Sequence, residues 1–233
     1  MHFMIQTIDG QIKHDFSFTL LEAIRYQNWF RNEQVCSFSL TDSVLPDFRK
    51  SAIPVGSVEF VSNYFEKHLN LKPAPRNVPE QLFTDAGRLI SNGSHLTTRY
   101  QKCFVKSNDT IKGFSDFVDP GDVLPAGNYQ FSAEIEMDSE WRAFVYQDGL
   151  VGLQNYSGDF TLFPDVSRIK EMIRNFSGAP VAYTLDVCVN SEGTFVVEVH
   201  DFFSCGLYGF ADLRKLPNMF AGWFNNFTTK NIA

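Results

Sequence analysis

The chain has 233 residues, of which 44% are hydrophobic and 20% are charged, a balance typical of a globular protein and not of a collagenous, low-complexity or broadly disordered chain. Its 24 Phe predict a core filled with aromatic rings. Twenty Lys plus Arg against 27 Asp plus Glu give a net charge of -7, whereas sequence-independent nucleic-acid binding depends on neutralising phosphates. We therefore expect no nucleic-acid partner and no membrane partner, although this charge is compatible with a local basic pocket.

The sequence also bears on the compartment. No stretch reaches the roughly 18 apolar residues that a membrane-spanning helix needs, and the first residues, MHFMIQTIDGQIKH, lack the features of a signal peptide. We therefore expect a cytoplasmic protein. The four cysteines lie far apart without a CxxC pair, which favours reduced thiols over a disulfide framework or a zinc ribbon. They are Cys36, Cys103, Cys188 and Cys205.

Residues 1–75 are predicted to form a small α/β unit. Ser57 follows a turn at Pro54 and Gly56 and is placed to cap a helix. Residues 76–99 are predicted to form a linker and a helix, because three prolines fall within LKPAPRNVPEQL. The other predicted elements of the first unit are strands near residues 3–7 and 35–40 and a helix near residues 19–30.

Residues 100–233 are predicted to form the larger region. Short alternating runs there indicate antiparallel strands, namely QKCFVK, YQFSAEIEM, WRAFVY and LVGLQNY. A three-residue loop, residues 147–149, is expected between the last two strands, and Asp165 is expected to cap a helix. The aromatic tail at Phe220, Trp223, Phe224 and Phe227 has helical spacing and favours a packing face. The predicted fold is α+β, with antiparallel sheets and flanking helices preceded by the small N-terminal α/β unit.

One predicted hairpin, AYTLDVCVNSEGTFVVEVHDFF, concentrates acidic residues. With a three-residue loop at residues 191–193, Asp186 lies opposite Glu198 on one face of the ladder, with Cβ atoms about 5 Å apart, and His200 follows on that face. Like charges facing each other are destabilising, so a cation, a shared proton or splaying into solvent must offset them. A divalent ion such as Mg²⁺ and an exposed acidic face both fit this segment.

Basic residues precede this hairpin along the chain. Lys106 ends one apolar run, Lys112 begins the next, and Arg142 lies inside the run WRAFVY. Each lysine taken singly is typical of a solvated surface charge, and Arg142 could pair with Glu140 across a sheet face. Taken together, two lysines, an arginine and two acids in successive strands favour phosphoryl transfer, which depends on positioning and charge neutralisation.

These motifs together resemble a known family. FVK with a following lysine, SEWRAFV, AYTLDVCV and FVVEVHDFFSCGLYG are similar to the ATP-grasp superfamily, specifically its small divergent clade named for an arginine and two lysines, found largely in bacteria and their phages. The resemblance covers residues 100–210 and implies an ATP-grasp-like fold. It also implies ATP and Mg²⁺ or Mn²⁺ as cofactors, and the host cytoplasm as the location if a phage encodes the chain.

The resemblance further implies a reaction and a role for each residue. ATP-grasp enzymes typically convert a carboxylate into an acyl phosphate, which an amine attacks to form an amide. Residues 131–135 would be the hinge under adenine. The implied catalytic residues are Arg142, Lys106 and Lys112, the implied cofactor-binding residues are these three with Glu134 and Ile135, and the implied metal ligands are Asp186, Glu198 and His200.

One position departs from the family pattern. The metal motif usually has Glu, any residue, then Asn, but this chain has Glu198, Val199 and His200. Imidazole suits softer ions than Mg²⁺, so the change would shift metal preference toward Mn²⁺ or weaken catalysis. Two hypotheses follow. The first is a carboxylate–amine ligase, with a peptide or protein among its candidate substrates. The alternative is a nonenzymatic nucleotide-binding or protein-interaction protein on a degenerate ATP-grasp fold.

Overall fold

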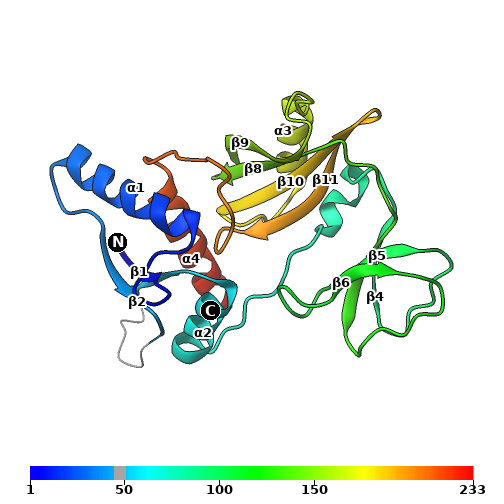
Figure 1. The fold of residues 1–233 in the computed structure, drawn as a ribbon, viewed down its shortest axis with the longest axis horizontal. Coiled ribbons are helices and arrows are strands. Elements are labelled where there is room, and N and C mark those ends of the chain that lie inside the picture. The colour runs from blue at the N-terminus through cyan, green and yellow to red at the C-terminus, as the bar shows by residue number, and fades with distance from the viewer. Residues whose placement is uncertain (45–50, 233) are drawn as a thin grey trace. The chain divides into compact units, whose positions relative to one another are not determined.

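The structure is a computed structural model that describes residues 1–44 and 51–232 (Figure 1). The chain divides into two compact units. The first contains residues 1–73, 180–183 and 201–233, and the second contains residues 74–179 and 184–200. Helices, antiparallel sheets and a small parallel sheet near the N-terminus confirm the predicted α+β class. The domain boundaries expected from the sequence stay a prediction.

The first unit is built on a three-stranded parallel sheet. Its strands are β1 (His2–Gln6), β2 (Ser37–Thr41) and β3 (Ile53–Val55), in the order β2-β1-β3. Phe3 pairs with Phe38 on one side and with Ile53 on the other. The middle of β1 is an uninterrupted apolar run that is fully buried, as is typical of a central parallel strand.

Three helices accompany this sheet: α1 (Asp15–Arg31), α2 (Val58–Leu69) and α4 (Leu216–Ile232). Helix α2 begins at the predicted cap, where the Ser57 side chain accepts a hydrogen bond from the Phe60 amide. Helices α1 and α4 contact each other (Figure 1). The aromatic tail lies inside this unit, with the Trp223 ring 4.6 Å from Phe203 and 5.6 Å from Phe65. The predicted packing face is thereby confirmed.

The second unit contains two antiparallel sheets of four strands each. The first has the order β4-β7-β5-β6, with β4 (Ile90–Ser94), β5 (Cys103–Ser107), β6 (Ser115–Val118) and β7 (Asn128–Ser132). The second has the order β11-β10-β8-β9, with β8 (Ser139–Tyr146), β9 (Gly149–Gly158), β10 (Ala182–Asn190) and β11 (Gly193–Asp201). The predicted antiparallel strands are therefore present, and β4 is a strand that the sequence did not predict.

Both predicted three-residue loops are two-residue turns. Strand β8 ends at Tyr146, which pairs with Gly149 at the start of β9. The two turn residues, Gln147 and Asp148, have φ values of 50° and 59°. This is the pattern of a type I′ turn, whose twist matches that of the flanking strands, so Gln147 and Asp148 take the conformation predicted for Gly149. Strand β11 likewise begins at Gly193, one residue earlier than expected.

Two further elements complete the second unit: the 3₁₀ helix η1 (Glu80–Asp85) and helix α3 (Val166–Asn175). The Asp165 side chain caps α3 as predicted, accepting hydrogen bonds from the amides of Ser167 and Arg168. No helix among the described residues is long and apolar enough to cross a membrane. All four cysteines are free thiols, and three of them are buried.

The contribution of the Asp165 cap to stability can be tested by substitution. Asp165→Ala removes the acceptor of two amides at the start of the helix, so we expect the free energy of unfolding to fall by about 1 kcal/mol in urea denaturation. Lys170→Ala, at an exposed position of the same helix, is the matched control and should change it by less than about 0.5 kcal/mol. Equal losses in the two variants would contradict the capping role.

Candidate functional site

The centre of the site is a buried ion pair between neighbouring strands. Arg142 lies on β8 and Asp186 on β10, and they are 6% and 4% exposed. The guanidinium donates from Nε to Asp186 Oδ1 at 2.8 Å and from Nη2 to Oδ2 at 2.7 Å. This two-point contact fixes the orientation of both side chains and neutralises two charges that would be costly to bury singly.

A second ion pair joins the two sheets. Lys106 on β5 donates from Nζ to Glu198 Oε2 on β11 at 2.6 Å. His200 completes the arrangement, because its Nε2 lies 3.3 Å from Glu198 Oε2 and 3.5 Å from Asp186 Oδ2. Charges of alternating sign therefore run from Lys106 through Glu198, His200 and Asp186 to Arg142. We call these five residues the charge chain.

The pKa values of the two carboxyls and the imidazole follow from these contacts. Burial alone would raise the pKa of both carboxyls, but hydrogen bonds from Arg142 and His200 hold the pKa of Asp186 below its usual value. Those from His200 and Lys106 lower the pKa of Glu198 to about 2. Burial alone would lower the pKa of His200, yet hydrogen bonds to Asp186 and Glu198 raise it to about 9. The imidazole therefore carries a proton at neutral pH.

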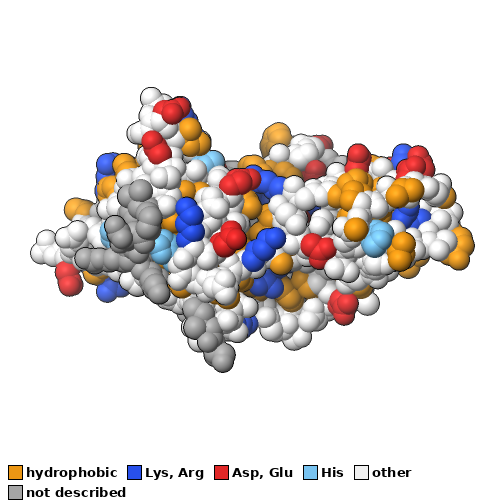
Figure 2. Space-filling model, turned by 90° about the horizontal axis from the view of Figure 1, so that it is seen from below, with side chains coloured by type: hydrophobic (Ala, Val, Ile, Leu, Met, Phe, Trp, Pro, Cys, Tyr) orange, Lys and Arg blue, Asp and Glu red, His pale blue; other side chains and the backbone are white. Residues whose placement is uncertain are grey.

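The charge chain explains how the acidic hairpin tolerates two neighbouring carboxylates. The repulsion between Asp186 and Glu198 is offset by the positive charges of Arg142, Lys106 and His200. Arg142 forms its two-point ion pair with Asp186, and Glu140 accepts a hydrogen bond from the Tyr156 hydroxyl at 2.9 Å. On the face drawn in Figure 2, acidic and basic side chains are interspersed.

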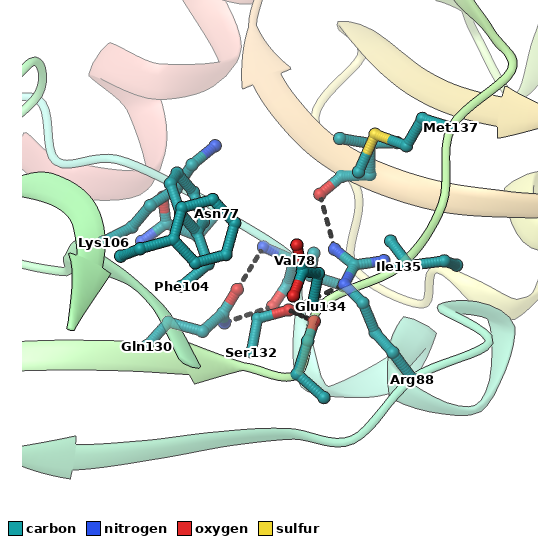
Figure 3. A pocket seen from close by; sticks show the side chains of 13 residues that line it. Asn77, Val78, Arg88, Phe104, Lys106, Gln130, Ser132, Glu134, Ile135 and Met137 are labelled. Carbon is teal, nitrogen blue, oxygen red and sulfur yellow. Dashed lines mark hydrogen bonds between the residues drawn. The ribbon is translucent and has the colours of Figure 1, made fainter. Parts of the chain in front are cut away.

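A pocket of about 300 Å³ adjoins the charge chain at Lys106. That volume lies within the range of small-molecule sites. Figure 3 shows Phe104 and Lys106 at one side of the pocket and Ile135 and Met137 at the other. Val197 of β11 and Phe117 of β6 add further apolar surface to the lining. Flat apolar walls with a few polar groups suit an aromatic base.

Four of the five residues predicted to lie under adenine, residues 131–135, line this pocket, and the first does not. Strand β7 ends at Ser132. Residues 133–137 belong to the segment that connects β7 to β8 and are not part of a strand. Ser132, Ala133, Glu134 and Ile135 line the pocket. Phe131, the first residue of the predicted hinge, instead lies in the core of its sheet with Val105 and Tyr129.

Three polar side chains of the lining were not predicted, namely Asn77, Arg88 and Gln130. Arg88 donates to Ser132 Oγ at 2.6 Å and to the carbonyl oxygens of Val196 and Val197 at 2.7 and 3.2 Å, so it ties β7 to β11 (Figure 3). The Gln130 side chain accepts a hydrogen bond from the Val78 amide at 3.0 Å and donates one to the Val78 carbonyl oxygen at 2.8 Å. The position of Gln130 between two aromatic residues in the run YQF was a sequence signal for its contact with Val78. No motif distinguished Arg88.

The second predicted lysine, Lys112, is not among the described residues that line the pocket. Lys112 is in the loop of residues 108–114 between β5 and β6, where it is exposed and has a φ of 55°. Among the described residues that line the pocket, Lys106 is present and Lys112 is not. The structure therefore brings together Lys106, Arg142 and the three predicted metal ligands, whereas Lys112 belongs to a loop outside the pocket lining.

The predicted metal ligands Asp186 and Glu198 already have protein cations as partners in the structure. Asp186 and Glu198 offer the oxygen donors that Mg²⁺ prefers, so the donor chemistry fits a divalent cation. In the structure each carboxylate is bound by a protein cation, Arg142 for Asp186 and Lys106 for Glu198. Within residues 1–44 and 51–232, no group of three or more His, Cys, Asp or Glu side chains is arranged to hold a metal ion. A metal would therefore have to replace some of these contacts.

Comparison with known proteins identifies the family. Residues 37–219 match the model of an ATP-grasp domain, family 3 of the clade named for an arginine and two lysines. This chain belongs to the ATP-grasp superfamily, in that family of the clade. The resemblance inferred from FVK, SEWRAFV and the acidic hairpin is thereby confirmed. A search of curated proteins finds no match.

Solved structures share the ATP-grasp fold with this domain at low sequence identity. The RimK domain protein ATP-grasp from Sphaerobacter thermophilus DSM 20745 is 15% identical, with a TM-score of 0.53 over 98% of this chain and 100% of that chain. The D-alanine–D-alanine ligase from Bacillus anthracis is 9% identical, with a TM-score of 0.56 over 99% of both chains. The ATP-grasp ligase PsnB, complexed with minimal precursor, Mg and ADP, is 11% identical, with a TM-score of 0.51 over 95% and 96%.

The buried ion pair of this ATP-grasp domain predicts a large loss of stability in Asp186→Asn. The variant leaves the Arg142 guanidinium buried against a neutral amide, so we expect unfolding free energy to fall by about 3 kcal/mol in urea denaturation. Glu171→Gln is the matched control. It breaks an exposed pair with Arg168, 3.0 Å apart, and should cost no more than about 0.5 kcal/mol.

Joint replacement tests the origin of that loss. Arg142→Met combined with Asp186→Leu removes both buried charges and should recover most of the stability. If repulsion between Asp186 and Glu198 dominated instead, Asp186→Asn would be at least as stable as the wild type. That outcome would contradict the structural role of the pair.

Proposed function

We propose that this chain is an ATP-dependent carboxylate–amine ligase that forms an amide through an acyl phosphate. One observation carries the proposal: Lys106 lines the pocket and also begins the charge chain. A nucleotide whose base occupies the apolar part of the pocket would direct its phosphates toward Lys106 and on toward Arg142. Membership of the ATP-grasp superfamily supports ATP as that nucleotide.

In this proposal the lining selects the base and the ribose. Ile135 and Phe104 supply apolar surface for adenine, and the exposed Glu134 side chain accepts hydrogen bonds from the ribose hydroxyls. Arg88 holds Ser132 against the carbonyls of β11, which keeps the segment after β7 in place. A lining fixed in advance lowers the ordering cost of binding.

The cations act on the phosphates. Lys106 would bind them from β5, Lys112 would approach from the loop between β5 and β6, and Arg142 would contact the transferred phosphoryl group. Arg142 is suited to that role because its two bonds to Asp186 fix the guanidinium plane before any ligand arrives. A donor that needs no reorientation stabilises developing charge most effectively.

The proposed reaction has two steps. A carboxylate oxygen attacks the γ-phosphorus of ATP, the bond from that phosphorus to the β–γ bridging oxygen breaks, and ADP leaves with the electron pair. The amine nitrogen then attacks the carbonyl carbon of the acyl phosphate and loses a proton, and inorganic phosphate departs. Small carboxylates and amines, and a peptide or protein supplying either group, are the substrate classes that we propose, and the cytoplasm is the proposed compartment.

Mg²⁺ or Mn²⁺ is the proposed metal, with Asp186, Glu198 and His200 as its ligands. The ion would neutralise part of the phosphate charge when bound. His200 also supports the alternative of a nonenzymatic nucleotide-binding or interaction protein, because a protonated imidazole between two carboxylates competes with a metal for both. Turnover distinguishes the two candidate functions.

The first test of the proposal is ATP binding. We expect isothermal titration of the purified chain with ATP and Mg²⁺ or Mn²⁺ to show saturable binding. Lys106→Met should weaken it about tenfold or more, because it removes a charge-assisted contact to phosphate and keeps the aliphatic stem. Lys170→Met, on an exposed face of α3, is the control and should bind as the wild type does. Equal affinity in all three proteins would contradict the assigned pocket.

The second test is the product. With a carboxylate and an amine that support turnover, ATP should yield ADP and phosphate in equal amounts, because the γ-phosphoryl group is the one transferred. Nucleotide chromatography and a phosphate assay on the same sample measure both. Formation of AMP and pyrophosphate would refute the acyl-phosphate route. ATP binding without turnover on a broad panel of carboxylates and amines would instead support the nonenzymatic alternative.

A further inference from the structure

The outer face of α1 exposes two large aromatic rings with a pair of opposite charges between them. Phe18 is 60% exposed and Trp29 is 75% exposed. Glu22 and Arg25 lie between them, 44% and 68% exposed at their side chains and 2.7 Å apart. At 100° per residue, all four positions fall within a stripe about 60° wide along the helix. The opposite face of α1 is buried, so this stripe is the solvent-facing side.

This stripe is self-complementary. Its four residues are separated by four, three and four positions along the helix. In chain order they are aromatic, acidic, basic and aromatic: Phe18, Glu22, Arg25 and Trp29. Two copies of α1 packed antiparallel, with a two-fold axis between positions 22 and 25, place Phe18 opposite Trp29 of the other copy. The same axis places Glu22 opposite Arg25, and symmetry repeats each contact. An isologous interface requires a patch of this kind.

We propose that the outer face of α1 binds a second copy of this chain, forming a two-fold dimer through antiparallel α1 helices. Charge complementarity favours this occupant, because the reciprocal Glu22–Arg25 contacts require the same patch on the partner. The inference is independent of ATP and of the proposed ligase activity. It concerns only α1 and the residues beside it within the first unit.

Neighbouring aromatic residues hold the patch in place. Tyr26 lies with its ring 5.8 Å from Trp29 and 6.0 Å from Phe30, and it is stacked on the latter. Arg214 fixes this group, because its guanidinium lies 5.2 Å from the centre of the Phe30 ring and its Nε contacts the Tyr26 hydroxyl at 3.2 Å. An ordered aromatic group loses little conformational freedom when a partner arrives.

The size of the patch sets the expected affinity. A single aromatic side chain buries roughly 150–250 Å² when fully covered. Two such side chains and their neighbours on each copy remain below the roughly 800 Å² per partner of a standard interface. We therefore expect a weak dimer that forms reversibly as protein concentration rises.

Charge exchange tests the symmetry of the interface. Sedimentation velocity over a concentration series should show a monomer–dimer equilibrium for the full-length wild type. Glu22→Arg places two arginines opposite each other at both symmetry-related contacts, and Arg25→Glu does the same with two glutamates. Each single variant should raise the dimer Kd about tenfold. The double variant Glu22→Arg with Arg25→Glu restores both pairs and should recover the wild-type Kd.

Tryptophan fluorescence gives a second readout. Trp29 is 75% exposed, whereas Trp141 and Trp223 are 6% and 1% exposed. Dimerisation should therefore shift the emission to shorter wavelength and reduce acrylamide quenching as concentration rises, and the two single variants should weaken both changes. Trp29→Ala should reduce dimer formation while leaving the thermal melt of the monomer unchanged.

Three outcomes would overturn the proposal. One is a wild type that stays monomeric at all concentrations. Another is a double variant that is as monomeric as the single variants, which would show that Glu22 and Arg25 do not face each other across a two-fold axis. The third is a dimer whose Kd does not respond to either single variant, which would mean that another surface forms it.

Discussion

The site depends on the buried contact between Arg142 and Asp186. Two charges inside a sheet are tolerated only when they satisfy each other, and the paired hydrogen bonds at 2.8 and 2.7 Å do so. Because Asp186 is held in this way, it presents Oδ2 to His200, and His200 in turn reaches Glu198. Each group in the charge chain is thus positioned by its neighbour, and the fixed end is the pair Arg142–Asp186 on β8 and β10, which are mostly buried.

The connection between the two sheets of the second unit is of a different kind. The Lys106 and Glu198 side chains are 25% and 20% exposed, so this pair is more accessible to water than Arg142 and Asp186, whose side chains are 8% and 5% exposed. Arg88 joins the same sheets through neutral acceptors on Ser132, Val196 and Val197. If an anionic ligand drew Lys106 away from Glu198, the Arg88 contacts would still join the two sheets and keep the pocket lining in place.

The caps of individual helices were predictable from the sequence, but the side-chain partners on different strands were not. The caps at Ser57 and Asp165 depend on residues within one helical turn, and both are present. The partner of Arg142 is 44 residues away on β10, and only the strand order brings the two together. The turn at residues 147–148 was predicted one residue too long, because Gln and Asp adopt positive φ there, where glycine was expected to.

The charges of the site also bear on the proposed role of a second lysine, Lys112. With His200 protonated, the charge chain holds three cations and two carboxylates, which leaves one unit of positive charge. The three phosphates of ATP carry several negative charges, so this residue set cannot balance them alone. In the proposed complex a metal ion, Lys112 and Arg88 of the pocket lining are the candidate sources of the remaining positive charge. Lys112 belongs to the exposed loop of residues 108–114, and so it can contribute only if that loop approaches the bound phosphates.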